Sequence, residues 1–193
     1  MKNKIAILIL LPALLLITGV NQLYGQGFSS QGTAAIDANV VGAIQVTNLS
    51  DINFGLISQN INTTAPVLDP QDSGSDENIV DDGNVSVGKF VFEAASEQSI
   101  IFTFSAATLT EDGGADELEF TPSIQGSQGD ETAPNDGARG GDTAISNNDS
   151  VLLTGTHYTV WVGGTLGLGG STTAPVNVGA YDGTFTITVD YDI

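Results

Sequence analysis

The chain has 193 residues, of which 23 are acidic and 4 are basic, and its formal net charge is −19. A chain this acidic is repelled by nucleic acid and by anionic membrane surfaces, so we expect neither as a partner. It contains no cysteine, which excludes disulfides, thiolate zinc sites and cysteine nucleophiles.

The amino terminus has the residue order of a secretory signal peptide. Lys2 and Lys4 give a positive start, an apolar run extends from Ile5 to Val20, and small and polar residues follow. This run is shorter than the roughly 20 apolar residues that a membrane-spanning helix requires. We therefore predict that residues 1–25 are cleaved and that the protein is exported in a Gram-negative bacterium. The alternative is a retained anchor, and no cysteine follows the run to accept a lipid.

The remaining chain, residues 26–193, has the length of one domain. Without the leader, only Lys89 and Arg139 oppose the same 23 acids, so the formal charge of this part is −21. Because disulfides are excluded, its stability has to come from core packing, bound ions or assembly with partners. We expect no membrane insertion of this part.

Short runs of Val, Ile, Phe and Thr, with almost no helical periodicity, predict an all-β domain. The first expected strand covers residues 33–47, where Ala34, Ile36, Ala38 and Val40 share one face. A short strand over 51–57 follows.

Residues 58–84 read as a long acidic loop with prolines and glycines. Carboxylates close together on such backbone suit a hard cation, so a calcium site is the sharpest metal hypothesis here. The alternative is that these acids are simply solvated. The candidate calcium ligands are Asp69, Asp72, Asp76, Glu77, Asp81 and Asp82.

The second half of the chain predicts further strands in quick succession. Strands are expected over 85–94 and 99–106, with Phe102 and Phe104 facing the core, and residues 109–121 predict a hairpin around EDGGADE. A second polar loop covers 126–150. The remaining expected elements are strands over 151–154 and 157–166, a loop over 167–180, a turn at Asp182-Gly183 and a last strand over 184–193.

About seven to nine strands without a helix to cover a parallel sheet favour an antiparallel β-sandwich with long acidic loops. A closed barrel is the alternative. The orientation of Trp161 stays open, because either face of its strand could be buried. His157 is the single histidine, and no nucleophile-elbow motif accompanies it, so we predict no catalytic function and no catalytic residues.

Three stretches resemble a family of small secreted bacterial proteins known as domain of unknown function 4402. They are TAAIDANVVGAIQVTNLSDINFG (33–55), VWVGGTLGL (160–168) and GAYDGTFTITVDY (179–191). That family looks distantly similar to spore-coat-U-type and chaperone–usher pilin subunits, which are immunoglobulin-like sandwiches. Tyr191 and Gly179 stand near the positions of a terminal Tyr and an earlier Gly in pilins. Two residues follow Tyr191 instead of one, and the disulfide of many pilins is missing.

The resemblance implies an immunoglobulin-like sandwich and a fimbria-like structural or adhesive subunit at the cell surface, outside the cell or in the periplasm. It also implies self-association by strand exchange with sister subunits, with residues 27–41 as the candidate donor strand. The alternative for this stretch is pairing within its own sandwich. The alternative function is a stand-alone binding module for carbohydrate or matrix, stabilised by calcium.

Overall fold

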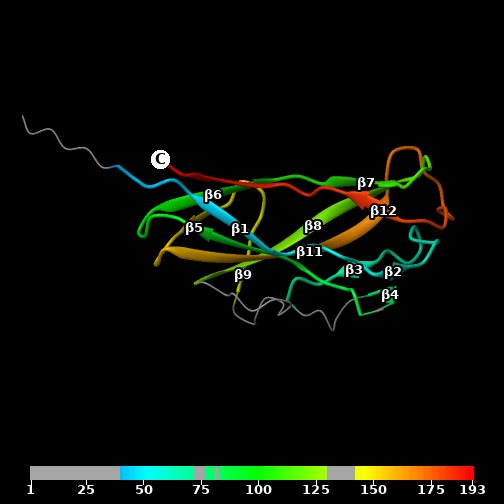
Figure 1. The fold of residues 1–193 in the computed structure, drawn as a ribbon, viewed down its shortest axis with the longest axis horizontal. Helices are drawn as coiled ribbons and strands as arrows, with labels where there is room; N and C mark the ends of the chain where they lie inside the picture. Colours follow the sequence, from blue (N-terminus) through cyan, green and yellow to red (C-terminus); the bar gives the residue numbers. More distant parts are fainter. Residues whose placement is uncertain (1–39, 72–76, 81–82, 130–141) are drawn as a thin grey trace, which may run out of the picture. The chain divides into compact units, whose positions relative to one another are not determined.

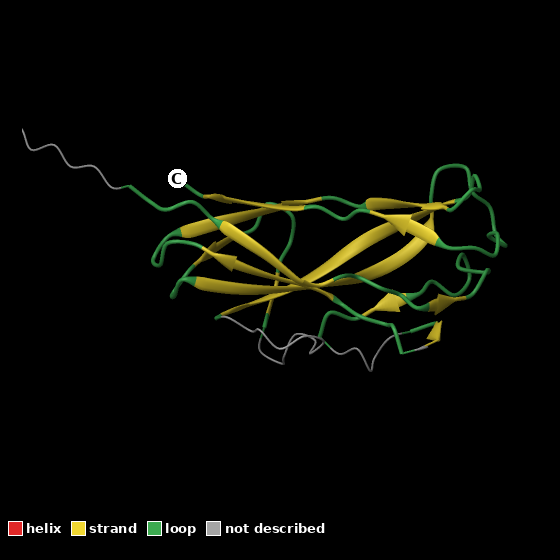
Figure 2. Ribbon diagram, in the orientation of Figure 1, coloured by secondary structure: helices red, strands yellow, loops and turns green. Residues whose placement is uncertain are grey.

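The computed structural model describes residues 40–71, 77–80, 83–129 and 142–193, and these contain thirteen strands and no helix (Figures 1 and 2). The all-β prediction is therefore confirmed. Residues Val41–Ile193 make one compact unit, to which the description below applies. The predicted leader lies outside the described residues, and no helix within them is long and apolar enough to cross a membrane.

The strands form two facing antiparallel sheets and a small third one, as expected for a β-sandwich. The large sheet has the order β1-β5-β11-β8-β7-β12, with β3 added beside β11 and β9 beside β8. Its strands are β1 (Gln45–Ser50), β3 (Val67–Leu68), β5 (Gly88–Glu93), β7 (Ala107–Glu111), β8 (Glu117–Gln128), β9 (Thr143–Ala144), β11 (His157–Leu168) and β12 (Tyr181–Gly183). The three-stranded sheet is β10 (Ser150–Leu152), β6 (Ser99–Phe104) and β13 (Ile187–Tyr191), and β2 (Leu56–Ile57) pairs with β4 (Ile79–Val80).

The chain changes sheets twice at one corner of the sandwich. β6 pairs with β13 in the three-stranded sheet, and β7 pairs with β12 in the large one. Only Ser105 and Ala106 separate β6 from β7, and only residues 184–186 separate β12 from β13. Two strands therefore bend together from one sheet into the other, as strands do at the corners of β-sandwiches.

The main core lies between the two sheets. Phe92 of the large sheet packs edge-to-face on Phe102 of the three-stranded sheet, with ring centroids 5.4 Å apart. Tyr158 contacts Phe102 from a second strand at 5.7 Å. Phe92 and Phe102 are completely buried, which stabilises the fold by about 1.5–3 kcal/mol for each side chain. The predicted core position of Phe102 is confirmed, while Phe104 is half-buried.

β11 is buried on both faces, and at Gly163 the absence of a side chain lets another segment of the chain approach it closely. Val160 and Val162 face the inter-sheet core, whereas Trp161 lies on the opposite face and is 2% exposed. A Cβ at Gly163 would overlap the carbonyl oxygen of Leu68, so the chain after β3 passes directly over this glycine. Trp161 is buried although it points away from the main core. Beside it, Lys89 is 1% exposed, with Nζ 5.3 Å from the indole centroid.

Several expected boundaries were wrong because pairing with distant strands overrides local composition. The loop expected over 58–84 contains β3 and β4, and the loop expected over 126–150 contains β9, while β8 runs on to Gln128. Asp182-Gly183 is not a turn but part of β12, which pairs with β7. The first described strand begins at Gln45, and residues 33–39 of the predicted strand lie outside the described residues. The hairpin expected over 109–121 is confirmed by the pairing of β7 with β8.

The sandwich has two ends, which we call the terminal end and the tip. The terminal end holds the start of β1, the end of β13 and the turn between β5 and β6, since Gln45 pairs with Glu93 and Asp192 donates to Ser99. The tip holds β2, β4 and the loop 176–180 that precedes β12. Figure 1 shows the terminal end on the left and the tip on the right.

Candidate functional site

The predicted calcium ligands are only partly within the described residues. Asp72, Asp76, Asp81 and Asp82 lie outside them. Asp69 Oδ1 accepts a hydrogen bond from the backbone N–H of Gln71 at 2.8 Å, and the backbone of Glu77 pairs with that of Val67. Within the described ranges, no three His, Cys, Asp or Glu side chains are grouped so that they could hold a metal ion.

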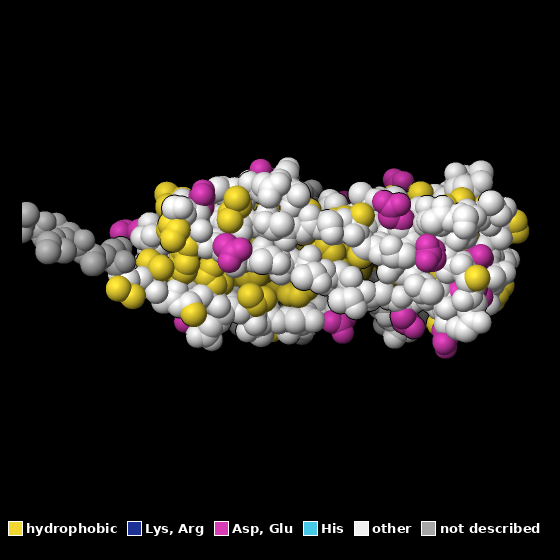
Figure 3. Space-filling view, turned by 90° about the horizontal axis from the view of Figure 1, so that it is seen from above, with side chains coloured by type: hydrophobic (Ala, Val, Ile, Leu, Met, Phe, Trp, Pro, Cys, Tyr) yellow, Lys and Arg dark blue, Asp and Glu magenta, His cyan; other side chains and the backbone are white. Residues whose placement is uncertain are grey.

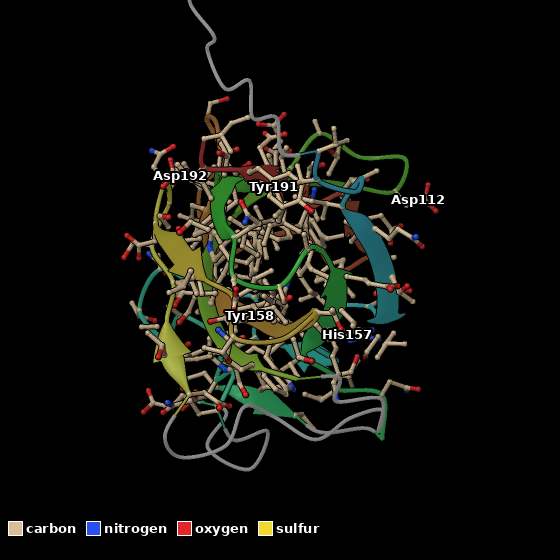
Figure 4. All side chains as sticks on the ribbon, turned by 90° about the vertical axis from the view of Figure 1, so that its left-hand side faces the viewer. Asp112, His157, Tyr158, Tyr191 and Asp192 are labelled. Atoms are coloured by element: carbon tan, nitrogen blue, oxygen red, sulfur yellow. The ribbon has the colours of Figure 1, made fainter. Side chains whose placement is uncertain are left out.

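His157 opens β11 at the terminal end, away from any grouping of catalytic side chains in the described residues. Its Nδ1 lies 3.0 Å from Thr156 Oγ1, and the side chain is half-buried. Figure 4 looks onto this end, with Tyr191 and Asp192 in the upper layer and His157 and Tyr158 in the lower one. Tyr158 is 2% exposed, and burial, followed by the charge of Asp142, raises the pKa of its phenol to about 12.

The most developed surface feature is a groove along one open side of the sandwich. Two cavities of about 520 and 600 Å³ share the lining residues Ile52, Phe54, Leu109 and Asp182, so they lie next to each other. We call the two cavities together the side groove. One wall is the chain over 48–59, and the other is the chain over 176–185. Figure 3 looks at the molecule from above and shows apolar side chains exposed between scattered acidic ones.

The floor of the side groove is aromatic near its middle. Phe120 of β8 is the centre, with Phe54 edge-to-face at 5.9 Å and Phe185 edge-to-face at 5.7 Å. Phe54 comes from one wall and Phe185 from the other, so the Phe120 ring ties both walls to the large sheet. Phe90 lines the same cavity and is half-buried. The groove therefore opens onto the core rather than onto a polar surface.

Two strands with unpaired edges lie toward the terminal end from the groove, and of their residues Asn48 of β1 lines it. In the described residues, β13 has β6 as its one sheet neighbour, and β1 has β5 as its one sheet neighbour. Asp192 N–H donates to Ser99, and alternation in an antiparallel ladder then directs Asp190 and Thr188 to β6 as well. The backbone groups of Ile187, Val189 and Tyr191 consequently point to the free edge.

The face of β1 that points toward the three-stranded sheet is not covered by that sheet in the described structure. Val46 stands opposite Phe92 in the register, on the face that should meet the three-stranded sheet, yet it is 53% exposed. Three strands are too few to cover the large sheet across its whole width.

At the tip, the two walls of the groove are joined. Val176 N–H donates to the Gln59 carbonyl at 3.0 Å, and Gln59 Nε2 donates to the Val176 carbonyl at 2.7 Å. Next to these two hydrogen bonds, the backbone N–H of Asn177 donates to Asp116 Oδ2 at 2.8 Å, and Asn177 Nδ2 donates to Glu111 Oε2 at 3.0 Å. The groove is thus open toward the terminal end and bounded at the tip.

Tyr191 anchors the strand that continues from the groove wall. The backbone N–H of Ala95, in the turn between β5 and β6, donates to the Tyr191 hydroxyl at 2.9 Å. The free edge is therefore carried by a strand that is fixed at its end. Sequence reasoning missed the groove itself, since it arises from how distant strands pair; of the wall over 176–185, the predicted last strand covers only residues 184 and 185.

Comparison with known protein families gives a match over most of the chain. The model of a protein family described as a domain of unknown function, DUF4402, matches residues 44–191, which is most of the chain and includes both walls of the side groove. No curated protein matches the chain. No solved structure matches it either.

Proposed function

The chain belongs to the DUF4402 family, and we propose that it is an exported, non-catalytic structural subunit of a fimbria-like assembly at the bacterial cell surface. The observation that carries this proposal is the side groove with its unpaired edges. An open strand edge recruits other strands, and natural monomers normally blunt it. Here the edge of β13 is free in the described structure, and the strand continues from the apolar groove wall that ends at Phe185, as an acceptor for one more strand would.

The residues ahead of β1 are the proposed strand for this groove, supplied by a sister copy. From Gln26 to Asn39 an extended chain spans about 46 Å at about 3.3 Å per residue. The eleven positions from Tyr181 to Tyr191, which cover the end of the groove wall and all of β13, span about 36 Å by the same rule. Ala34, Ile36 and Ala38 share one face of this segment and would enter the groove, while Ala35 and Asp37 would face solvent.

The side groove offers little for catalysis. Its carboxylates, Asp51 and Asp182, lie on its exposed rim, and its lining in the described residues contains no histidine or lysine. The alternative function is an extracellular binding module for carbohydrate or matrix. The two cavity volumes favour it to this extent, since both lie in the range of ligand sites.

The proposal is tested by the molar mass of purified residues 26–193, measured by light scattering and on an unboiled SDS gel. Two matched variants separate strand insertion from general adhesion. Ile36→Asp places a charge on the face that would enter the groove, and Ala35→Asp places the same charge on the other face.

We expect a ladder of multiples for the wild type and for Ala35→Asp, and monomer for Ile36→Asp, because a buried, unpaired carboxylate costs several kcal/mol. A wild-type chain that stays monomeric up to millimolar concentration would refute self-assembly and favour the binding module. Equal ladders for both variants would refute this segment as the inserted strand.

A further inference from the structure

Beyond the inserted strand, and resting on the proposed function, we propose a second contact between copies: the tip of one subunit meets the terminal end of the next. Among the described residues from Val41 onward, six large apolar side chains are more than half exposed. They are Val46, Leu152 and Ile193 at the terminal end, and Leu56, Val80 and Val178 at the tip.

The members of each set are distant in the sequence, and strand pairing brings them to the same end of the sandwich. Leu152 pairs with Ser99, whose carbonyl accepts from Asp192 next to Ile193, so both apolar residues share the terminal end. At the tip, Leu56 pairs with Val80 across β2 and β4, and Leu56 and Val178 line the same cavity. Single exposed apolar residues are ordinary on protein surfaces. Their restriction to the two opposite ends is the feature that needs a cause.

Chain direction supplies that cause. β1 leaves the terminal end and β13 arrives there, so the two strands run in opposite directions. A strand that adds antiparallel to β13 starts at the terminal end of the acceptor and leaves the groove at its tip. Antiparallel pairing is the slightly more stable mode per residue.

The donor's own domain must then begin at the acceptor's tip. Only Val40–Ile44 separate the segment ending at Asn39 from the donor's β1, and these five residues span about 16 Å at full extension. The donor's β1 starts at its terminal end. Its terminal end is therefore brought against the acceptor's tip, which places Val46, Leu152 and Ile193 near Leu56, Val80 and Val178.

The opposite strand direction gives a different assembly. If the segment folded back into its own groove, it would run antiparallel to β1 and parallel to β13, through a tight turn before Gln45. If it entered a sister groove in that direction, two terminal ends would face each other and a closed dimer would result. A tip-to-terminal-end contact joins unlike surfaces, which propagates into an open filament.

The test uses substitutions at exposed positions outside the side groove. Val80→Glu changes the tip, Leu152→Glu changes the terminal end, and Ser123→Glu adds the same charge on an exposed position of β8, away from both ends. Each is made in residues 26–193, and the concentration at half-assembly is measured by light scattering. Binding of a synthetic peptide of residues 27–41 to an Ile36→Asp chain reports separately on the groove.

We expect the half-assembly concentrations of Val80→Glu and Leu152→Glu to be at least about tenfold higher than that of Ser123→Glu. A tenfold change corresponds to about 1.4 kcal/mol of association free energy. Peptide binding should be the same in all three backgrounds. If all three variants assemble alike, the end-to-end contact is refuted and the proposed function stands. If the wild type neither assembles nor binds the peptide, the proposed function fails and this inference fails with it. A closed dimer that both end variants leave intact would also overturn the inference.

Discussion

Replacing Val189 by proline should block strand addition and leave the fold intact. The N–H of Val189 points to the free edge of β13, so proline removes a donor that makes no ladder bond in the described structure. Proline is tolerated at such edge positions, and its ring prevents a further strand from pairing there. The matched control is Thr188→Pro, whose N–H points to Thr103 of β6.

The two variants should differ in stability in a calculable way. Thr188→Pro removes a ladder hydrogen bond and leaves the Thr103 carbonyl without its donor, which costs about 1–3 kcal/mol. Val189→Pro exchanges one half-buried side chain for another with the same number of carbons, so its packing loss should be at most about 0.8 kcal/mol, the value of one buried methylene. For a domain of this size, 1 kcal/mol moves the melting temperature by about 2–4 °C.

The assay combines thermal unfolding with light scattering on the same samples. We expect Val189→Pro to melt within about 3 °C of the monomeric Ile36→Asp chain and to stay monomeric. Thr188→Pro should melt clearly lower. Assembly of Val189→Pro to wild-type length would refute the reasoning, because no strand could then be using the free edge of β13.

Three further predictions concern stability and salt. Because the pKa of Tyr158 is raised to about 12, its neutral form is favoured on folding. The resulting contribution to the free energy of unfolding is present below pH 10 and is lost as pH rises toward 12, by up to about 2.7 kcal/mol. Urea unfolding of a Tyr158→Phe chain should not show this loss. Gly163→Ala should destabilise the fold markedly because its Cβ would overlap the Leu68 carbonyl, whereas Gly167→Ala, with no atom within 4 Å, should be nearly neutral in the same urea titration. Assembly should strengthen between about 0.02 and about 0.5 M NaCl, because salt screens repulsion between copies that each carry −21; light scattering that falls with salt would contradict this.

The strands in which apolar and polar residues alternate could be predicted from the local sequence pattern alone. Ile187, Val189 and Tyr191 are half-buried between exposed Thr188 and Asp190, as the two-residue period predicts. The hairpin between β7 and β8 followed in the same way from the EDGGADE turn signal. All-β class also followed, since no segment after the leader has helical periodicity.

Features that depend on distant partners could not be read this way. Asp182-Gly183 has turn composition, yet pairing with β7 makes it a strand. Trp161 is buried on the face away from the main core, and nothing local to Trp161 signals that burial. The side groove depends on the unequal widths of the two sheets, which no single segment encodes.

The most direct test of the central claim is hydrogen exchange at individual backbone amides of β13, compared between assembled wild type and monomeric Ile36→Asp chains. If a sister strand completes the sandwich, the amides of Ile187, Val189 and Tyr191 gain protection on assembly. Those of Thr188 and Asp190, already directed to β6, change little. Equal exchange of Ile187, Val189 and Tyr191 in the two states would show that assembly leaves this edge open, and the account would be wrong.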